Sequence, residues 1–292
     1  MTTRRWLLRA PLAAVAGWSR TGRAEGPARI VSVGGAVTET VFALGAGAQV
    51  VAVDSTSRFP PVVRSLPQIG YLRSLAPEGL LSLRPDLLLL SEEAGPAQAV
   101  AVLRAANAPI RMVPEQPSGE GVVRKIGSVA AALGVDGSAL AAAVGQDWAA
   151  LDAPIAALRP VRAIFVLSAS RGAPLVVGEG TQASAMLRAC GATNAITGFI
   201  GYRPLAAEAA AQAAPEAVVM MDHALIEAGG IDAVLSMPAL AVTPVARTRR
   251  VLAIDGSYAL AVGPRAAHAR RDLAALLHPG AELPQLPARA WT

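Results

Sequence analysis

The sequence predicts an α/β protein of two lobes with mainly parallel sheets, joined by a helix. Short apolar strands alternate with helical segments in both halves, which is typical of parallel sheets. Between the halves, the alanine-rich stretch 121–158 has no strand signal. The halves also share a residue pattern at one constant offset. We therefore expect an N-terminal lobe over 28–135, a bridging helix over 136–159 and a C-terminal lobe over 160–292.

The N-terminal lobe is inferred from four short apolar runs with helical segments between them. The leucines after Asp86 predict a strand buried on both faces, as is usual in parallel sheets. Gly45 follows the first helical segment, where glycine commonly ends a helix. The expected strands are 30–33, 50–53, 86–90 and 110–113, and the expected helices are 38–44, 77–83 and 98–106.

The bridge and the C-terminal lobe follow from the same patterns. Trp148 and Leu151 lie on one helical stripe of the strand-free stretch. The apolar run 162–167 restarts the alternation of strand and helix, which continues through the rest of the chain. The last helix is expected over 265–277 and stops before Pro279, because proline cannot continue a helix.

The two halves repeat one pattern at an offset of 130 residues. General α/β periodicity would give strands and helices in both halves, but without a fixed offset. The shared offset of leucine, glutamate, proline, acid and strand favours duplication of one lobe architecture. The first copy reads Leu75-Ala-Pro-Glu78, then Pro85-Asp86 and four leucines; the second reads Leu205-Ala-Ala-Glu208, then Pro215-Glu216 and Ala217-Val-Val-Met220.

Residues 1–24 predict an export signal. They hold five arginines and no acid, a short apolar stretch over 7–17, and small residues before a cleavage site at Glu25. The pair Arg4-Arg5 also fits a twin-arginine signal, with the general secretory route as the alternative. The remaining chain has 21 basic and 21 acidic residues, so the net charge of +5 does not indicate nucleic-acid binding. We expect a soluble periplasmic protein with the leader removed.

Signals for enzymatic chemistry are weak. Gly45-Ala-Gly47-Ala follows a helix and precedes a strand, whereas a phosphate-binding loop must follow a strand and open a helix. The three histidines have no metal-ligand spacing, and no Gly-x-Ser-x-Gly elbow is present. His268 and His278 are expected to face solvent, and the single cysteine, Cys190, is expected to be a buried thiol. We expect a binding protein rather than an enzyme.

Tyr71 is the strongest candidate for a ligand contact. It lies in a loop on the side of the sheet where the strands end, which is where α/β folds bind ligands. Its phenolate is a hard oxygen donor that can serve as the axial ligand of ferric haem. Arg73, two residues on, would stabilise the phenolate by its positive charge. The alternative is a tyrosine partly buried in a loop without a ligand.

Several segments together resemble the periplasmic haem-binding proteins of ABC haem importers. The resemblance covers residues 29–279, and its first segment is the run Leu66–Asp86, which contains Gly70-Tyr71-Leu72-Arg73. It implies two Rossmann-like lobes joined by one long helix, and capture of ferric haem b between the lobes through Tyr71. Arg73 would bind a haem propionate or stabilise the tyrosinate. The other matching segments are Gly191–Asn194, Gly198–Leu205, Leu240–Pro244 and Gly263–Arg265.

The resemblance also implies partners and further site residues. The haem would pass to a permease dimer with its ATPase, and an outer-membrane haem receptor would act upstream. Glu78 and Glu208 would dock one lobe each onto the permease; alternatively, both are only favourable charges at helix N-termini. Where some members carry a haem-contacting histidine, this chain has Arg171, a candidate for a propionate contact. His223 is a candidate second ligand or a partner of the ligand tyrosine, or else faces solvent.

Two other functions remain open at this point. One is a cobalamin- or ferric-siderophore-binding protein of the same architecture. The other is a periplasmic enzyme that acts on haem, which the absence of an obvious oxidant-handling group disfavours.

Overall fold

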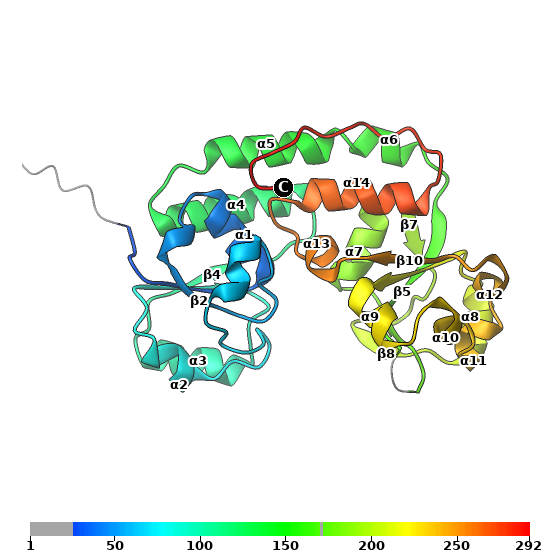
Figure 1. Cartoon of the computed structure of the whole chain (residues 1–292), viewed down its shortest axis with the longest axis horizontal. Coiled ribbons are helices and arrows are strands. Elements are labelled where there is room, and N and C mark those ends of the chain that lie inside the picture. Colours follow the sequence, from blue (N-terminus) through cyan, green and yellow to red (C-terminus); the bar gives the residue numbers. More distant parts are fainter. Residues whose placement is uncertain (1–25, 170–171) are drawn as a thin grey trace, which may run out of the picture.

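The computed structural model describes residues 26–169 and 172–292, and it forms two α/β lobes side by side (Figure 1). The predicted leader, 1–24, and the candidate Arg171 lie outside the described residues. Within the described ranges, no helix has the length and apolar character that a membrane span requires.

The N-terminal lobe is built on a parallel sheet of four strands in the order β2-β1-β3-β4. Three predicted strands match the structure residue for residue, and β3 begins one residue later than predicted. All five residues of β3 are buried, because helices cover both faces of the sheet. The strands are β1 (Ile30–Val33), β2 (Val50–Val53), β3 (Leu87–Ser91) and β4 (Ile110–Val113).

Alternate residues of β3 pack on opposite faces of this sheet. Leu87 and Leu89 contact the cluster under α1 (Gly35–Ala43) and α4 (Gly119–Leu133). Leu88 and Leu90 pack with side chains of α2 (Pro77–Ser82) and α3 (Ala97–Ala105). This alternation follows from the two-residue period of a strand.

The bridge between the lobes is not the single helix predicted over 136–159. Residues 119–156 form three helices: α4, α5 (Ser138–Ala149) and α6 (Asp152–Ala156). The break between α5 and α6 has a local cause, because the ring of Pro154 is incompatible with an unbroken turn at Ala150, four residues earlier. In Figure 1, α5 and α6 run one after the other along one edge of both lobes.

The C-terminal sheet is mixed, with the strand order β10-β9-β5-β6-β8 and with β7 also paired to β5. Strands β10, β9, β5 and β7 pair in parallel, whereas β6 pairs antiparallel with both β5 and β8. The short strands β6 and β8 were not predicted. The strands are β5 (Val161–Ser168), β6 (Leu175–Val177), β7 (Ala192–Asn194), β8 (Tyr202–Pro204), β9 (Ala217–Met221) and β10 (Val251–Ile254).

Helices cover both faces of the C-terminal sheet. Phe165 of β5 packs toward one face and Ile164 toward the other. The first face carries α7 (Gln182–Ala189), α13 (Gly256–Leu260) and α14 (Ala266–Leu277); the second carries α8 (Ala207–Ala213), α9 (Asp222–Glu227), α10 (Ile231–Leu235), α11 (Pro238–Ala241) and α12 (Pro244–Thr248).

The predicted repeat is confirmed by the positions of the elements. Strands β3 and β9 each have five residues, and their first residues, Leu87 and Ala217, stand at the same offset of 130. The amide of Asp86 donates to the carbonyl of Arg29, and the amide of Glu216 donates to that of Arg162, at 2.9 and 2.7 Å. Both lobes therefore enter this strand through the same backbone contact.

The segment after α14 returns along the bridge. Arg289 donates to Asp147 of α5 at 2.7 Å. His268 and His278, predicted to face solvent, are instead partly buried, and their rings lie 3.1 Å from the carbonyl oxygens of Pro287 and Cys190 respectively. Cys190 is a buried thiol as expected, and burial raises its pKa to about 12.

A buried ion pair joins the two lobes. Glu39 of α1 is 4% exposed and accepts two hydrogen bonds from Arg265, which immediately precedes α14. The guanidinium also lies 3.7 Å from the ring centre of Phe59. Burial raises the pKa of Glu39 from its ordinary 4.5 to about 7, although the charge of Arg265 lowers it.

This pair predicts a pH-dependent stability. A carboxyl whose pKa is higher in the folded than in the unfolded chain contributes stability that is fully present below about pH 4.5 and lost as the pH rises through about 7. The free energy of unfolding, measured in urea across this range, should therefore fall less with rising pH in Glu39→Gln than in the unaltered protein. Glu120→Gln, at an exposed pair on α4, is the control; an unchanged pH slope in Glu39→Gln would contradict the expectation.

Candidate ligand cleft

A cavity of about 600 Å³ lies between the two lobes. Its walls include residues that follow the carboxyl ends of β1, β3, β4, β9 and β10, so both sheets point their strand ends toward it. This is the edge at which open α/β sheets bind ligands.

Two glycines shape one wall of the cleft. Gly34 and Gly35 form the turn from β1 into α1, and Gly34 has φ of 111°. A Cβ atom would lie 2.9 Å from Ser91 at Gly34 and 2.8 Å from the carbonyl oxygen of Thr56 at Gly35. Only glycine therefore allows this turn to lie against the neighbouring loops.

Tyr71 lines the cleft, as predicted, and the residue is 46% exposed. The loop that carries it is held from both sides, because Leu72 and Leu75 are buried. The amide of Leu75 donates to the carbonyl of Gly95, and the amide of Gly95 donates to the carbonyl of Leu72, both at 2.8 Å. Gly70, with φ of 92°, provides the left-handed turn before Tyr71. An anchored loop thus presents an accessible phenol.

Arg73 lines the same wall and forms an ion pair with Glu93. Burial lowers the pKa of Arg73, but Glu93, together with the neighbouring phenol of Tyr202, raises it above its ordinary value. Arg73 is therefore a permanent positive charge close to Tyr71, as the sequence suggested.

The C-terminal lobe supplies the facing wall. His223, in the first turn of α9, is exposed and lines the cleft, so the structure brings Tyr71, Arg73 and His223 to one cavity. Tyr202 of β8 also lines it and is 41% exposed. Glu78 and Glu208 lie elsewhere, exposed in the first turns of α2 and α8, which in Figure 1 are on the side opposite to α5 and α6.

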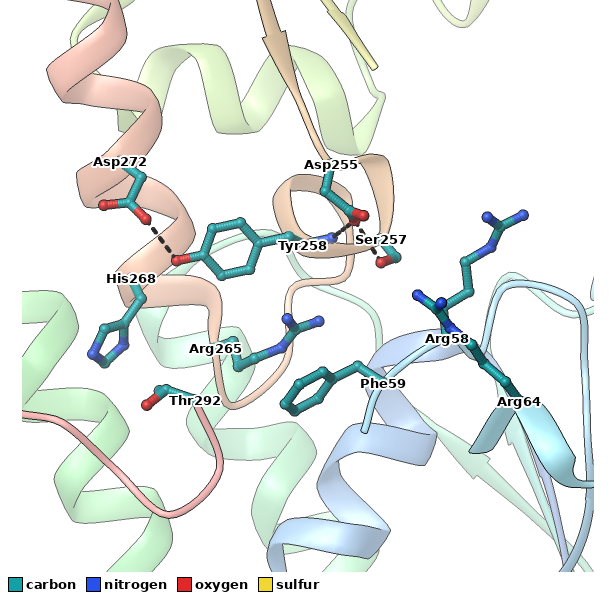
Figure 2. A pocket seen from close by; sticks show the side chains of 10 residues that line it. All are labelled: Arg58, Phe59, Arg64, Asp255, Ser257, Tyr258, Arg265, His268, Asp272 and Thr292. Atoms are coloured by element: carbon teal, nitrogen blue, oxygen red, sulfur yellow. Dashed lines mark hydrogen bonds between the residues drawn. The ribbon is translucent and has the colours of Figure 1, made fainter. Parts of the chain in front are cut away.

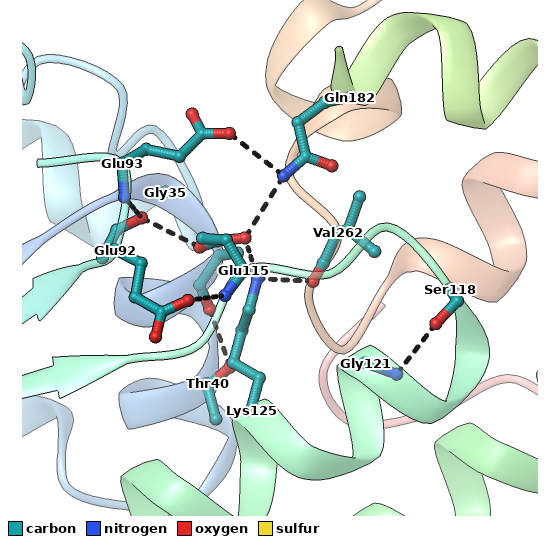
Figure 3. Close-up of polar contacts among 12 residues, drawn as sticks. Gly35, Thr40, Glu92, Glu93, Glu115, Ser118, Gly121, Lys125, Gln182 and Val262 are labelled. Atoms are coloured by element: carbon teal, nitrogen blue, oxygen red, sulfur yellow. Dashed lines mark hydrogen bonds and ion pairs between the residues drawn. The ribbon is translucent and has the colours of Figure 1, made fainter. Parts of the chain in front are cut away.

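A polar network lies at the wall of the cleft, where Glu93, Glu115, Gln182 and Val262 line it (Figure 3). Lys125 of α4 is fully buried, and its ammonium donates to Glu115 at 2.7 Å and to the carbonyl oxygen of Val262 at 2.8 Å. Gln182, at the start of α7, donates to Glu115 at 3.4 Å and to Glu93 at 3.3 Å. The network therefore joins side chains of the N-terminal lobe and bridge to the C-terminal lobe.

Sequence reasoning missed Glu93, Glu115, Gln182, Tyr202 and Lys125. Some signals were available: Gly201-Tyr202 follows Gly70-Tyr71 at an offset of 131, one from the repeat, and Lys125 is the only lysine of the chain. Glu93 and Glu115 each follow a strand end. No sequence signal marks Gln182, because its contacts form between the lobes.

The third tyrosine, Tyr258, lines a different cavity. A second cavity, of about 450 Å³, is lined by Tyr258, Phe59 and Arg265 among others (Figure 2). The Tyr258 hydroxyl donates to Asp272 at 2.9 Å, and burial together with this carboxylate raises the pKa of Tyr258. Tyr71 and Tyr202 are thus the tyrosines that face the inter-lobe cleft. Among the described residues, no group of three or more histidine, cysteine or acidic side chains is arranged to hold a metal ion.

Comparison with known proteins now identifies the family. The family profile described as periplasmic binding protein matches residues 30–258. The chain belongs to this family. The membership agrees with the expectation of a binding protein of a transport system rather than an enzyme.

Two solved structures are similar over most of the chain. The periplasmic haem-binding protein BhuT, in complex with two haems, is 42% identical, with a TM-score of 0.80 over 85% of this chain and 97% of that one. The periplasmic haem-binding protein RhuT from Roseiflexus sp. RS-1, in apo form, is 38% identical, with a TM-score of 0.82 over 88% and 100%. The similarity to haem-binding members that the sequence motifs indicated is confirmed.

A shorter similarity points to another ligand class. The vitamin B12-binding protein of Pectobacterium carotovorum subsp. carotovorum is 33% identical over 84 residues, which are 29% of this chain and 30% of that protein. The match thus spans less than a third of that relative.

Proposed function

We propose that the protein is the haem-binding component of an ABC importer in the periplasm, which captures ferric haem b between its lobes and delivers it to the membrane permease. The observation that carries this proposal is the accessible phenol of Tyr71 at the cleft, beside the permanently charged Arg73. The similarity to BhuT and RhuT over most of the chain supports the same ligand.

Each cleft residue has a defined task in this proposal. The Tyr71 oxygen, as phenolate, binds the ferric iron. Arg73 meets a haem propionate, since a carboxylate leaving water needs a charged or hydrogen-bonding partner. His223 and Tyr202 line the cleft from the C-terminal lobe, and His223 would be the second ligand or a partner of the ligand tyrosine. Apolar side chains from both lobes would cover the macrocycle: Leu72, Leu167, Leu175, Met221, Leu260 and Val262.

Binding of hemin compared with binding of cyanocobalamin distinguishes haem transport from cobalamin transport. The local similarity to a vitamin B12-binding protein suggests cobalamin as the alternative ligand. Purified protein should develop a Soret band on titration with hemin, and cyanocobalamin in excess should leave that band unchanged. The cobalt of cyanocobalamin already has its axial positions filled, by its own nucleotide base and by cyanide. It therefore has no vacant position for the phenol of Tyr71. Displacement of hemin by cyanocobalamin, or the lack of a Soret band, would contradict the proposed ligand.

For the permease we propose docking through Glu78 and Glu208, which project one from each lobe at equivalent positions of the repeat. Both are exposed, and the ligand cleft is formed by other residues. A two-lobed binding protein meets a two-fold permease, so equivalent acids on both lobes can meet equivalent cations on the permease.

The double variant Glu78→Lys/Glu208→Lys is expected to bind hemin as the unaltered protein does but to deliver it to permease-containing vesicles at least about tenfold more slowly, because rim charges act mainly on association. The matched control is Glu120→Lys/Glu282→Lys, which makes the same change of charge at exposed acids on α4 and the final segment. Normal delivery by the first double variant, or equal loss in the control, would exclude these two glutamates as docking charges.

A further inference from the structure

Glu93 connects the two walls of the cleft through its two carboxylate oxygens. Its Oε2 accepts a hydrogen bond from Arg73 of the same lobe. Its Oε1 accepts one from the amide of Gln182, which belongs to the C-terminal lobe, at 3.3 Å. The Glu93 side chain is 31% exposed and the Arg73 side chain 42%, so both remain accessible from the cleft.

The pair Arg73–Glu93 has the chemistry that a haem propionate would use. A propionate is a carboxylate on a short alkyl chain, and a guanidinium binds carboxylates through paired N–H donors. Glu93 already occupies one of these donors, the terminal Nη2 of Arg73. A second carboxylate that binds the same guanidinium is repelled at short range by the negative charge of the first.

We propose that Glu93 is a specificity-determining residue of the cleft: a resident carboxylate that competes with the cargo's propionate for Arg73. The inference rests on the proposed function and deepens it. Only a ligand with a carboxylate of its own displaces Glu93 from Arg73. A neutral macrocycle leaves the pair Arg73–Glu93 intact.

The displacement has a consequence for the opposing lobe. Gln182 shares its amide between Glu93 and Glu115, and Glu115 is fixed by the ammonium of Lys125. When Glu93 leaves Arg73, its hydrogen bond to Gln182 is free to change, whereas Glu115 keeps the contacts with Lys125 and Gln182 that Figure 3 shows. Binding of the propionate therefore alters a hydrogen bond between the two lobes, the one from Gln182 to Glu93.

The test compares hemin with hemin dimethyl ester, whose propionates carry no charge. Release of each ligand to an excess of apomyoglobin is measured for the unaltered protein and for Glu93→Gln. The variant should release hemin about two- to fivefold more slowly, the range expected for an accessible ion pair, and should release the ester at the unaltered rate. In the Arg73→Ala background, Glu93→Gln should no longer slow the release of hemin.

Glu92→Gln is the matched control, because it removes the same charge from the neighbouring residue. The Glu92 side chain accepts a hydrogen bond from the backbone amide of Glu115 rather than from Arg73. Equal effects of Glu93→Gln on hemin and its ester, faster release of hemin, or the same slowing in Glu92→Gln would overturn the inference while leaving the proposed function intact. Failure of the unaltered protein to bind hemin would overturn both.

Discussion

Replacing Lys125 by methionine is expected to lower the free energy of unfolding by about 3–5 kcal/mol, the usual effect of breaking a buried ion pair by removing one partner. The ammonium of Lys125 is fully buried and lies 2.7 Å from a carboxylate oxygen of Glu115, whose side chain is 10% exposed. Methionine fills a similar volume but leaves Glu115 charged without its cation. It also leaves the carbonyl oxygen of Val262 without its donor.

Unfolding in urea, followed by circular dichroism, measures this effect. Arg124→Met is the matched control, because Arg124 is the neighbouring cation of α4 and its ion pair with Glu120 is exposed; its loss should cost less than about 1 kcal/mol. Lys125→Met/Glu115→Gln should recover part of the lost stability, since no charge then remains unpaired. Equal stability of Lys125→Met and Arg124→Met would contradict this role of the buried pair.

Tyr71→Phe is expected to speed the release of hemin by roughly a hundredfold or more. Changes that only reorient a metal ligand commonly cost 10–100-fold in metal affinity, and this variant removes the donor oxygen itself. The phenyl ring keeps the apolar contacts of Tyr71, so the loss reports the bond to iron rather than packing. Transfer of hemin to apomyoglobin measures the rate.

Tyr258→Phe is the control for this substitution. The Tyr258 hydroxyl is bound to Asp272 outside the inter-lobe cleft, so its removal should alter stability and leave hemin release unchanged. Release rates of Tyr71→Phe within twofold of the unaltered protein would exclude Tyr71 as the ligand.

The elements that the sequence predicted best are those whose cause is local. The four strands of the N-terminal lobe were placed within one residue, because helices cover both faces of a parallel sheet and its strands are therefore mainly apolar, although the edge strand β4 carries the exposed Arg111. The three-residue strands β6 and β8 carry too short a pattern to be recognised. The break at Ala150 is marked in the sequence only by Pro154, within a stretch whose alanine-rich composition favours a continuous helix.

The part of the candidate site that lies beyond the ends of the strands could be predicted from the sequence, because the ends of parallel strands lie at one edge of a sheet. Tyr71, Arg73 and His223 were expected at the cleft, and the structure places all three there. Glu93, Gln182 and their shared contacts depend on how closely the two lobes approach each other, which no short segment of sequence encodes. The burial of Lys125 depends on the same approach, because one of its two partners, Val262, belongs to the other lobe.

The absorption and electron paramagnetic resonance spectra of the ferric hemin complex test the central proposal most directly. If the Tyr71 phenolate binds the iron, the complex of the unaltered protein should be high-spin and show a phenolate-to-iron charge-transfer band, which Tyr258→Phe retains and Tyr71→Phe loses. The same charge-transfer band in Tyr71→Phe, or a low-spin complex with two nitrogen ligands in the unaltered protein, would contradict it.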